Sequence, residues 1–407
     1  MNGTIVIIGG GQGGAEMAAQ LRQNGHAGEI VILADEAHLP YLRPPLSKGF
    51  LAGEVGKEAL LYKSAKTYAD AAITLRTGAR VVRIDRARRR VILADGEMLA
   101  YNRLVLATGG RARPIGVPGA QLKNIFYLRT RDDVEQIRPH LVAGRRIAII
   151  GGGYVGLETA AVAAKRGLNV SLLVRAPRVL NRVTSPELSA FYERMHRAAG
   201  VQIHTNVAVR GFSVGQGDAV GTVELGAHGS LAADLVVIGI GLVPNTELAE
   251  AAGLAVEDGI VVNERAQSSD PFIYAIGDCA MHAHHAFLQR PIRIESVPNT
   301  LEQARIAAAA ICGQPIPAAA PPWFWSDQYE LRLQMVGLAQ GHDELVMRGE
   351  PSAAGFMMFY LKGGIVIAAD AVNRPGEFMA AKRLVGARKA VAPARLADLM
   401  QPLKELR

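Results

Sequence analysis

Two glycine-rich motifs are the residues of this chain whose types and spacing most clearly point to chemistry. They read Gly9-Gly10-Gly11-Gln12-Gly13-Gly14 and Gly151-Gly152-Gly153-Tyr154-Val155-Gly156. Glycines spaced in this way allow a tight turn and bring backbone N–H groups close to a pyrophosphate, and the helix that follows directs its positive N-terminus at the phosphates. One copy is weak evidence. Two copies predict two bound dinucleotides, and therefore a redox enzyme that passes electrons between them.

Both motifs lie in a strand–turn–helix context. Residues 4–8, 15–23 and 29–34 are predicted to form a strand, a helix and a strand, and residues 146–174 repeat this pattern. Later strands of the two halves also end alike, at residues 104–110 and 235–241. This correspondence indicates an internal duplication.

Length and composition predict an α/β protein of several domains. The chain has 407 residues, of which 49% are hydrophobic and 44 are glycine. We expect two Rossmann-like dinucleotide-binding domains, one discontinuous (residues 1–112 and 243–320) and one continuous (residues 113–242). A Pro/Ala-rich linker then leads to a C-terminal α+β domain at residues 321–407.

The charge balance and the distribution of apolar residues indicate which classes of partner to expect among acidic proteins, nucleic acids and membranes. Lys and Arg number 45 against 37 Asp and Glu, a net charge of +8, which can steer an acidic partner. The basic residues are dispersed and match no nucleic-acid module, so we expect no nucleic-acid binding. No apolar run is long enough to span a membrane, and no signal peptide precedes the first strand. We therefore expect a cytoplasmic protein, either a monomer or a homodimer, with no membrane association.

Cysteine and histidine spacing predicts no metal site. Cys279 and Cys312 are far apart and belong to no C-x-x-C motif, so they are predicted to be buried, unreactive thiols. His282, His284 and His285 are close together, but three histidines bind a metal only when their side chains converge, which spacing alone does not supply. An exposed polar loop is the favoured interpretation.

An acid after the second strand would complete the first dinucleotide site. Asp35 follows Gly14 at about the twenty-residue spacing at which a carboxylate accepts hydrogen bonds from a ribose diol. Glu36 is the competing candidate.

Six further segments carry a family resemblance: residues 39–48, 106–111, 127–130, 276–280, 293–299 and 323–328. The most specific are Pro44-Pro45-Leu46-Ser47-Lys48 and Trp323-Phe324-Trp325-Ser326-Asp327-Gln328. With them the chain resembles the FAD-dependent ferredoxin reductases that serve bacterial cytochromes P450 and Rieske oxygenases. These enzymes belong to the flavoproteins with two dinucleotide-binding domains, typified by glutathione reductase.

The resemblance implies that FAD occupies the first site. Asp278 matches the residue that binds the ribityl chain, Val297 begins a helix that points at the flavin pyrimidine edge, and Lys48 lies near the isoalloxazine ring. The implied FAD-binding residues are Gly9, Gly11, Gly13, Gly14, Asp35, Lys48, Val81, Arg129, Asp278 and Val297.

The second site is implied to bind NADPH, NADH or both. The implied contacts are Gly151, Gly153, Tyr154, Gly156, Glu158, Arg175 and Arg182. NADH-using members of the family place an acid where this chain has Val174, followed by Arg175. Losing the acid removes the repulsion of a 2′-phosphate, and arginine binds phosphate well, so we expect a preference for NADPH. In the alternative, Arg175 is merely solvated and NADH still works.

The implied catalytic residues are Lys48, Glu158 and Trp325. A Lys48–Glu158 pair can orient the nicotinamide, while hydride passes directly to the flavin. Trp325 and Trp323 are predicted in a proline-flanked loop, and the resemblance puts Trp325 near the flavin and the partner surface.

The implied electron acceptor is a separate protein. The C-x4-C pair of disulfide reductases has no counterpart at residues 41–48, so the electrons must leave to an external carrier. The resemblance implies an acidic 2Fe–2S ferredoxin that supplies a P450 or Rieske oxygenase. The open alternatives are a reductase of rubredoxin or another acceptor, a disulfide reductase lacking its dithiol, and a flavoprotein like apoptosis-inducing factor.

Overall fold

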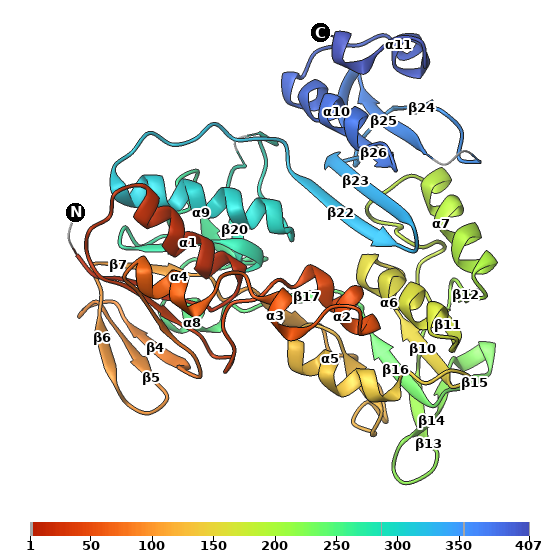
Figure 1. Cartoon of the computed structure of the whole chain (residues 1–407), viewed down its shortest axis with the longest axis horizontal. Coiled ribbons are helices and arrows are strands. Elements are labelled where there is room, and N and C mark those ends of the chain that lie inside the picture. Colours follow the sequence, from red (N-terminus) through yellow and green to blue (C-terminus); the bar gives the residue numbers. More distant parts are fainter. Residues whose placement is uncertain (1–2, 286, 353–354, 407) are drawn as a thin grey trace. The chain divides into compact units, whose positions relative to one another are not determined.

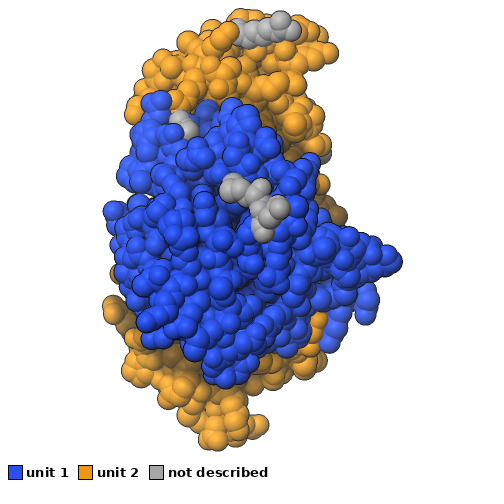
Figure 2. Space-filling view, turned by 90° about the vertical axis from the view of Figure 1, so that its left-hand side faces the viewer, with its two compact units in different colours: residues 1–42, 57–111, 243–322 blue, residues 43–56, 112–242, 323–407 orange. Residues whose placement is uncertain are grey.

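The computed structural model describes residues 3–285, 287–352 and 355–406, and the chain divides into two compact units, coloured separately in Figure 2. Unit 1 comprises residues 1–42, 57–111 and 243–322, and unit 2 comprises residues 43–56, 112–242 and 323–407. Strands β8 (Gly110–Ala112) and β17 (Leu242–Pro244) lie where the chain passes from one unit to the other. Within the described ranges, no helix is both long and apolar enough to cross a membrane. The three-domain boundaries stay a prediction.

Unit 1 is built on a five-stranded parallel sheet (Figure 1). Its order is β19-β7-β1-β2-β3, formed by β1 (Ile5–Ile8), β2 (Ile30–Leu33), β3 (Ile73–Arg76), β7 (Arg103–Leu106) and β19 (Ile273–Ala275). Strands β1 and β2 are runs of Ile, Val and Leu that are buried throughout, as expected for a parallel sheet covered on both faces. Helices α1 (Gln12–Gln23) and α9 (Val297–Cys312) pack side by side, and their alanines allow a close approach.

Smaller elements complete unit 1. One antiparallel sheet consists of β4 (Val81–Asp85), β5 (Arg90–Leu93) and β6 (Met98–Ala100), and a second small sheet consists of β18 (Ile260–Val262), β20 (Ala280–His282) and β21 (Ile292–Arg293). The remaining helices are α3 (Lys57–Leu60), α4 (Ala65–Asp70) and α8 (Glu247–Ala251).

Unit 2 repeats the same plan. Its parallel sheet has the order β12-β11-β10-β16-β9, formed by β9 (Ile125–Tyr127), β10 (Arg146–Ile150), β11 (Asn169–Leu173), β12 (Gln202–His204) and β16 (Leu235–Ile238). In each unit the strand before the glycine motif is central, with the next two strands on one side. This shared order agrees with the duplication predicted from the sequence.

The helices of unit 2 include the one that follows the second glycine motif. They are α2 (Gly49–Ala52), α5 (Arg131–Ile137), α6 (Tyr154–Lys165) and α7 (Pro186–Ala198). An antiparallel sheet contains β13 (Gly211–Val214), β14 (Val220–Glu224) and β15 (Ser230–Ala232).

The C-terminal part of unit 2 is an antiparallel sheet with two helices. Its order is β22-β23-β26-β25-β24, formed by β22 (Trp323–Gln328), β23 (Leu331–Gly337), β24 (Glu344–Arg348), β25 (Phe356–Lys362) and β26 (Ile365–Val372), followed by α10 (Pro375–Ala387) and α11 (Pro393–Ala397). The loop predicted at the tryptophans is wrong, because residues 323–328 form β22 and pair with β23 along its whole length. The neighbouring prolines precede the strand and so remove no hydrogen bond from the ladder.

Candidate dinucleotide sites and a buried charge pair

The first glycine loop has a backbone that other residues could not reproduce. Gly9 has a φ of +126°, and a Cβ placed on it would lie 2.1 Å from the carbonyl oxygen of Ala107. A Cβ on Gly14 would lie 2.0 Å from the Gly9 carbonyl oxygen. A Cβ on Gly11, in contrast, would meet no heavy atom within 4 Å. The loop is therefore closely packed at Gly9 and Gly14 and open at Gly11, where α1 begins.

The second loop has the same geometry. Gly151 has a φ of +119°, and its Cβ would lie 2.1 Å from the Gly239 carbonyl oxygen. A Cβ on Gly156 would lie 2.0 Å from the Gly151 oxygen, whereas a Cβ on Gly153 would again meet nothing within 4 Å. Both loops thus leave a cradle at a helix N-terminus that only the absence of a side chain keeps open.

The helix starts at these cradles have no side-chain cap. Gly11 precedes α1 and Gly153 precedes α6, and neither offers an oxygen to the first-turn N–H groups. Four other helices are capped by a side chain that accepts from a first-turn N–H: Ser64 for α4, Thr130 for α5, Ser185 for α7 and Ser296 for α9. Backbone N–H groups at a helix start that has no side-chain cap suit a phosphate anion. The residues present therefore fit two bound dinucleotides.

The two candidate ribose acids differ in their surroundings. Asp35 is exposed, directly beyond the end of the buried β2 segment. Glu36 is half-buried and accepts a hydrogen bond of 2.5 Å from the Tyr41 hydroxyl. Asp35 is the more accessible of the two to a ribose, and its role stays a prediction.

The loop after β19 brings Asp278 to the edge of the sheet that carries the first glycine loop. The Ile276 N–H donates to the Leu106 carbonyl at 2.9 Å, and the Gly277 N–H donates to Gln303 Oε1 at 2.5 Å. Gly277 has a φ of +78°, which turns the chain sharply before the half-buried Asp278. Gln303 belongs to α9, so this helix fixes the Asp278 turn.

Helix α9 also begins against the glycine loop of unit 1. A Cβ on Gly13 would lie 2.9 Å from a methyl carbon of Thr300, in the first turn of α9. Val297 is the first residue of that helix and is half-buried. Val81 is 7% exposed and packs in the core, so it could reach a cofactor only through its backbone.

In unit 2, Lys48 and Glu158 form an ion pair. Glu158, in the first turns of α6, is 3% exposed, and its Oε2 lies 2.8 Å from Lys48 Nζ. Ser47 donates to the same oxygen, and Ser326 Oγ donates to Oε1 at 2.6 Å. The lysine side chain keeps 20% of its surface exposed. A buried carboxylate with three donors is held in one orientation, with its charge compensated.

The segment that carries Lys48 is fixed to unit 2 by packing. The Arg138 guanidinium lies over the Phe50 ring, 5.4 Å from its centroid, and Arg166 donates to the carbonyl of Ala52 at 3.2 Å. Arg129, the remaining predicted FAD contact, lies in this unit just before α5, and its carbonyl accepts from Arg43 at 2.8 Å.

The residues after β11 define the predicted nicotinamide specificity loop. Val174 is 4% exposed, and its methyl groups lie 2.9 Å from a Cβ placed on Gly152. Arg175 and Arg182 are exposed. Arg178 is half-buried and donates to backbone oxygens and a side chain between residues 181 and 189. Arg175 and Arg182 are thus accessible to a phosphate, whereas Arg178 supports the loop.

Tyr154 and the tryptophans meet at the C-terminal sheet. Tyr154 stacks on Phe324 with ring centroids 4.8 Å apart, and its hydroxyl donates to Met335 Sδ at 2.8 Å. Tyr154 is the first residue of α6, and its side chain packs on the C-terminal sheet, so only its backbone is left to contact a dinucleotide. Trp325 is half-buried beside Trp323, with ring centroids 5.7 Å apart.

The histidine group is not the exposed loop predicted from the sequence. His282 and His285 are 7% and 5% exposed, and only His284 is exposed. Gln303 pairs with His282 Nε2 at 2.7 Å, and burial lowers the pKa of His282 to about 4. A buried hydrogen-bond partner, invisible in local sequence, makes this burial possible. Within the described ranges, no group of three or more His, Cys, Asp or Glu residues could hold a metal ion.

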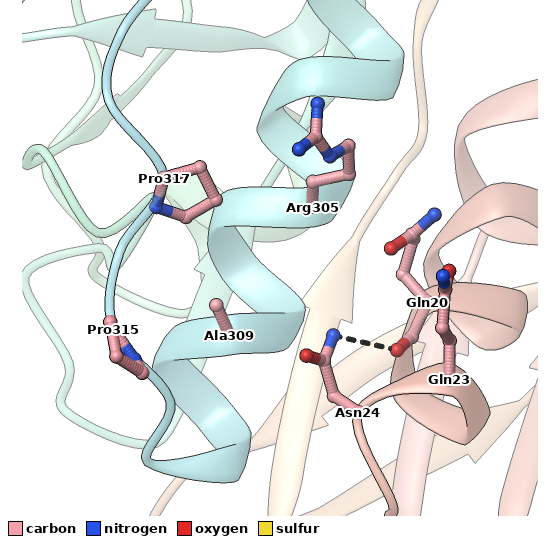
Figure 3. Close-up of a pocket in the computed structure, with 7 residues that line it drawn as sticks. All are labelled: Gln20, Gln23, Asn24, Arg305, Ala309, Pro315 and Pro317. Atoms are coloured by element: carbon pink, nitrogen blue, oxygen red, sulfur yellow. Dashed lines mark hydrogen bonds between the residues drawn. The ribbon is translucent and has the colours of Figure 1, made fainter.

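A shallow groove of about 510 Å³ lies between α1 and the chain after α9 (Figure 3). Its lining consists of Gln20, Gln23, Asn24, Arg305, Ala309, Pro315 and Pro317. Arg305 is the charged residue of this set and is exposed. An open groove lined by amides, prolines and one cation lacks the enclosing apolar walls that are typical of small-molecule sites.

These features match two protein families. Residues 3–308 match the pyridine nucleotide-disulphide oxidoreductase family, and residues 323–407 match the reductase C-terminal family. The chain belongs to the pyridine nucleotide-disulphide oxidoreductase family. It is 49% identical to putidaredoxin reductase CamA of Pseudomonas putida, over 100% of this chain and 97% of that protein. It is 43% identical to the ferredoxin–NAD(P)(+) reductase fdr of a Sphingomonas species, over 98% and 96%.

Solved structures of ferredoxin reductases have the same fold as this chain. The crystal structure of the covalent putidaredoxin reductase–putidaredoxin complex matches with a TM-score of 0.96 and 49% identity, over 99% of this chain and 98% of that chain. The ferredoxin reductase for the CYP199A2 system from Rhodopseudomonas palustris matches with a TM-score of 0.96 and 40% identity, over 99% of both chains. The predicted α/β fold, the family resemblance, the oxidoreductase class and the family's cofactors, FAD and NAD(P)H, are confirmed.

The roles of the individual site residues stay predictions, and two residues were missed. Ser47 and Ser326 complete the contacts of Glu158, and neither role was predicted from the sequence. Ser326 and Gln328 lie two residues apart in β22 and are both buried, and this polar pair at strand spacing was the available signal.

Proposed function

We propose that this protein is an FAD-dependent ferredoxin reductase. It takes electrons from NADPH, in preference to NADH, and delivers them through FAD to an acidic 2Fe–2S ferredoxin. That ferredoxin supplies a cytochrome P450 or a Rieske-type oxygenase. Bound FAD would accept a hydride from the nicotinamide and release its electrons singly, as an iron–sulfur acceptor requires.

The observation that carries the proposal is the buried Lys48–Glu158 pair at the start of the second dinucleotide helix. A fixed, compensated pair of charges suits the orientation of a nicotinamide, because hydride transfer depends on close alignment of donor and acceptor. Ser47 and Ser326 hold the carboxylate, and the carboxylate holds the ammonium. We assign the pair to positioning, with no proton transfer required of it.

The charges beyond β11 support NADPH as the preferred donor. Exposed Arg175 and Arg182 can both reach a phosphate without breaking a structural contact, whereas a buried Val174 offers no acceptor to a ribose diol. A guanidinium–phosphate contact is charge-assisted and can be bidentate.

Exposed positive charge on α9 supports an acidic protein as the electron acceptor. Arg305 is exposed and lies about 12 Å along the helix axis from Val297, at 1.5 Å per residue. A partner docked over this helix would therefore sit near the flavin edge that Val297 is proposed to face. The net charge of +8 favours association with an acidic carrier, and high salt should weaken it. We place Trp325 on the electron path to this partner.

We also propose a cytoplasmic location. Cys279 is buried, Cys312 is half-buried, and both thiols are free, which suits a reducing compartment.

The experiment that tests the function is a coupled assay on the purified FAD-loaded protein. Acidic 2Fe–2S ferredoxins, a rubredoxin and a disulfide substrate are offered in parallel, with NADPH and NADH side by side. We expect rapid flavin bleaching by NADPH and fast, salt-sensitive reduction of a 2Fe–2S ferredoxin. A flavin that neither nicotinamide bleaches would reject the proposal.

A reductase of rubredoxin is the second candidate. A rubredoxin–NAD(+) reductase of Pseudomonas putida is 37% identical over 91% of this chain. Faster reduction of the rubredoxin than of every ferredoxin would favour this alternative.

A further inference from the structure

A continuous chain of hydrogen bonds leads from Glu158 deep into unit 2. Ser326 Oγ donates to Glu158 Oε1 at 2.6 Å and accepts from Gln328 Nε2 at 3.1 Å. Gln328 Oε1 lies 2.9 Å from His196 Nε2, and the Tyr329 hydroxyl lies 3.0 Å from His196 Nδ1. Ser326, Gln328 and His196 are at most 1% exposed. From Glu158 to His196 the chain is therefore a buried polar path.

The hydrogens along this path have one consistent direction. Ser326 gives its hydrogen to a carboxylate that can only accept, so its oxygen must accept from the Gln328 amide nitrogen. The Gln328 oxygen therefore faces His196 and accepts from it. His196 then carries its hydrogen on Nε2 and accepts from the Tyr329 hydroxyl on Nδ1. Burial lowers the pKa of His196, which keeps the ring neutral as this tautomer requires.

A one-way chain that ends on a charge is stronger than its separate bonds. The Glu158 carboxylate polarises Ser326, and each polarised donor strengthens the bond behind it. A partly satisfied chain in the same place would cost stability, because each orphaned polar atom would be buried without a partner. Every group from Glu158 to His196 is satisfied here. The rotamer of Glu158 is thus coupled to the orientation of the His196 ring, three hydrogen bonds away.

The members of the path come from three separate elements. Glu158 lies on α6, Ser326 and Gln328 lie on β22, and His196 lies on α7. The path therefore fixes the carboxylate against both the C-terminal sheet and the last helix before β12.

We propose that His196 and Gln328 are positioning residues for hydride transfer, which fix Glu158, and through it the Lys48 ammonium, without touching either cofactor. This role rests on the proposed function of the Lys48–Glu158 pair. It assigns a task in the reaction to two buried side chains that lie far from the glycine cradles in sequence.

The first test follows the His196 ring in the FAD-loaded protein without any turnover. Histidine is labelled with 15N, and the His196 signals are identified by their loss in His196→Gln. We expect a neutral ring with hydrogen on Nε2, and we expect its 15N shifts to move in Glu158→Gln, three hydrogen bonds away. The matched control is His282, a buried ring in unit 1 that bonds to Gln303, whose shifts should stay in place. An unmoved His196 ring overturns the proposal.

The second test measures anaerobic flavin reduction by NADPH in a stopped-flow instrument. His196→Leu removes donor and acceptor together, and we expect the hydride-transfer rate to fall about tenfold while the Kd of NADPH changes by less than about twofold. His196→Gln can accept from Tyr329 and donate to Gln328, so it should restore most of the rate. Equal losses in both variants would indicate a merely structural role and overturn the proposal.

A milder variant covers the case in which His196→Leu does not fold. Tyr329→Phe removes only the last hydroxyl of the path, and it should slow hydride transfer about twofold with an unchanged Kd. A wild-type rate in Tyr329→Phe then counts against the path. If neither nicotinamide bleaches the wild-type flavin, the proposed function fails. If the wild type is bleached and every His196 variant is bleached equally fast, only the positioning role fails.

Discussion

Asp35 and Arg175 occupy equivalent positions in the two βαβ units, each the second residue beyond the last paired residue of a buried strand. The parallel registers end at Leu33 in unit 1 and at Leu173 in unit 2. The same place therefore carries an acid in one half and a base in the other. A carboxylate accepts from a ribose diol and repels a phosphate, whereas a guanidinium attracts a phosphate. We therefore predict that this one reversed charge distinguishes the two dinucleotides.

Replacing Arg175 by alanine should weaken the use of NADPH selectively. Losing one charge-assisted hydrogen bond costs about 1.5–3 kcal/mol, so kcat/KM for NADPH should fall at least about tenfold in Arg175→Ala while the value for NADH changes little. Steady-state kinetics with both donors checks this. Arg194→Ala, an exposed arginine on α7, is the matched control. A wild-type enzyme that prefers NADH tenfold would contradict the prediction.

The Lys48–Glu158 pair should control the rate of flavin reduction. Lys48→Ala leaves a buried carboxylate without its cation and frees the nicotinamide to misalign, so the reduction rate should fall about tenfold or more. Stopped-flow absorbance of the flavin measures it. The control is Lys165→Ala, which breaks the exposed pair between Lys165 and Glu330. A Lys48→Ala rate equal to that of the wild type would exclude the pair from the reaction.

The glycines of the second loop should separate into two classes. A methyl group on Gly153 meets no protein atom, so Gly153→Ala should fold with an unchanged Tm yet bind NADPH at least about tenfold more weakly, because the methyl occupies the phosphate cradle. A methyl on Gly156 collides with the Gly151 carbonyl, so Gly156→Ala should lower the Tm itself. Thermal unfolding and NADPH titration of the two variants check this. Full NADPH affinity in Gly153→Ala would place the pyrophosphate elsewhere.

Electrostatic docking predicts that Arg305 contributes to the rate of ferredoxin reduction. Arg305→Glu should raise the KM for an acidic ferredoxin several-fold at low salt and leave flavin reduction by NADPH unchanged, since the side chain is exposed on α9. Arg83→Glu, an exposed arginine on β4, is the control with the same change in charge. The difference between the variants should vanish at high salt. Equal effects of both substitutions would mean that only the net charge of the protein matters and that Arg305 has no specific role in docking.

Local features of the sequence were enough to predict the dinucleotide cradles. A buried apolar run, the spaced glycines and an Ala-rich helix lie within one short segment, and only glycine can occupy the backbone at Gly9 and Gly151. The fold followed from the repetition of that segment. The missing acid at Val174 and the arginine after it were also visible in the sequence, whereas the equivalence of Asp35 and Arg175 required the sheet registers.

Contacts between distant residues were not predictable from these patterns. The pairing of His196 with Gln328 was not predictable, because a buried polar residue is recognisable only when its partner is known. His282 was wrongly expected in an exposed loop for the same reason, since its partner Gln303 lies on a later helix. The run 323–328 was predicted as a loop because prolines flank it, although its aromatic residues are typical of a strand.

Asp370 should make the stability of the protein depend on pH. It is 4% exposed on β26, and its Oδ2 accepts from the hydroxyls of Tyr360 at 2.6 Å and Thr184 at 2.7 Å. Burial nevertheless raises the pKa of Asp370 to about 6. An aspartate in the unfolded chain has a pKa of about 3.9. Between these values the native state binds more protons than the unfolded state, so this group's contribution to stability falls as pH rises from about 4 to about 6.

Asp370→Asn removes this titration and retains an oxygen for the two hydroxyls. A shift of about two pKa units corresponds to about 3 kcal/mol, so the free energy of unfolding of the variant relative to wild type should rise by up to about 3 kcal/mol between pH 4 and pH 7. Urea unfolding at several pH values measures the difference. Asp70→Asn, which alters an exposed pair with Lys66, is the control and should show almost no such trend. A flat difference for Asp370→Asn would mean that the buried carboxyl is already ionised at pH 4, its two hydroxyl donors outweighing the cost of burial.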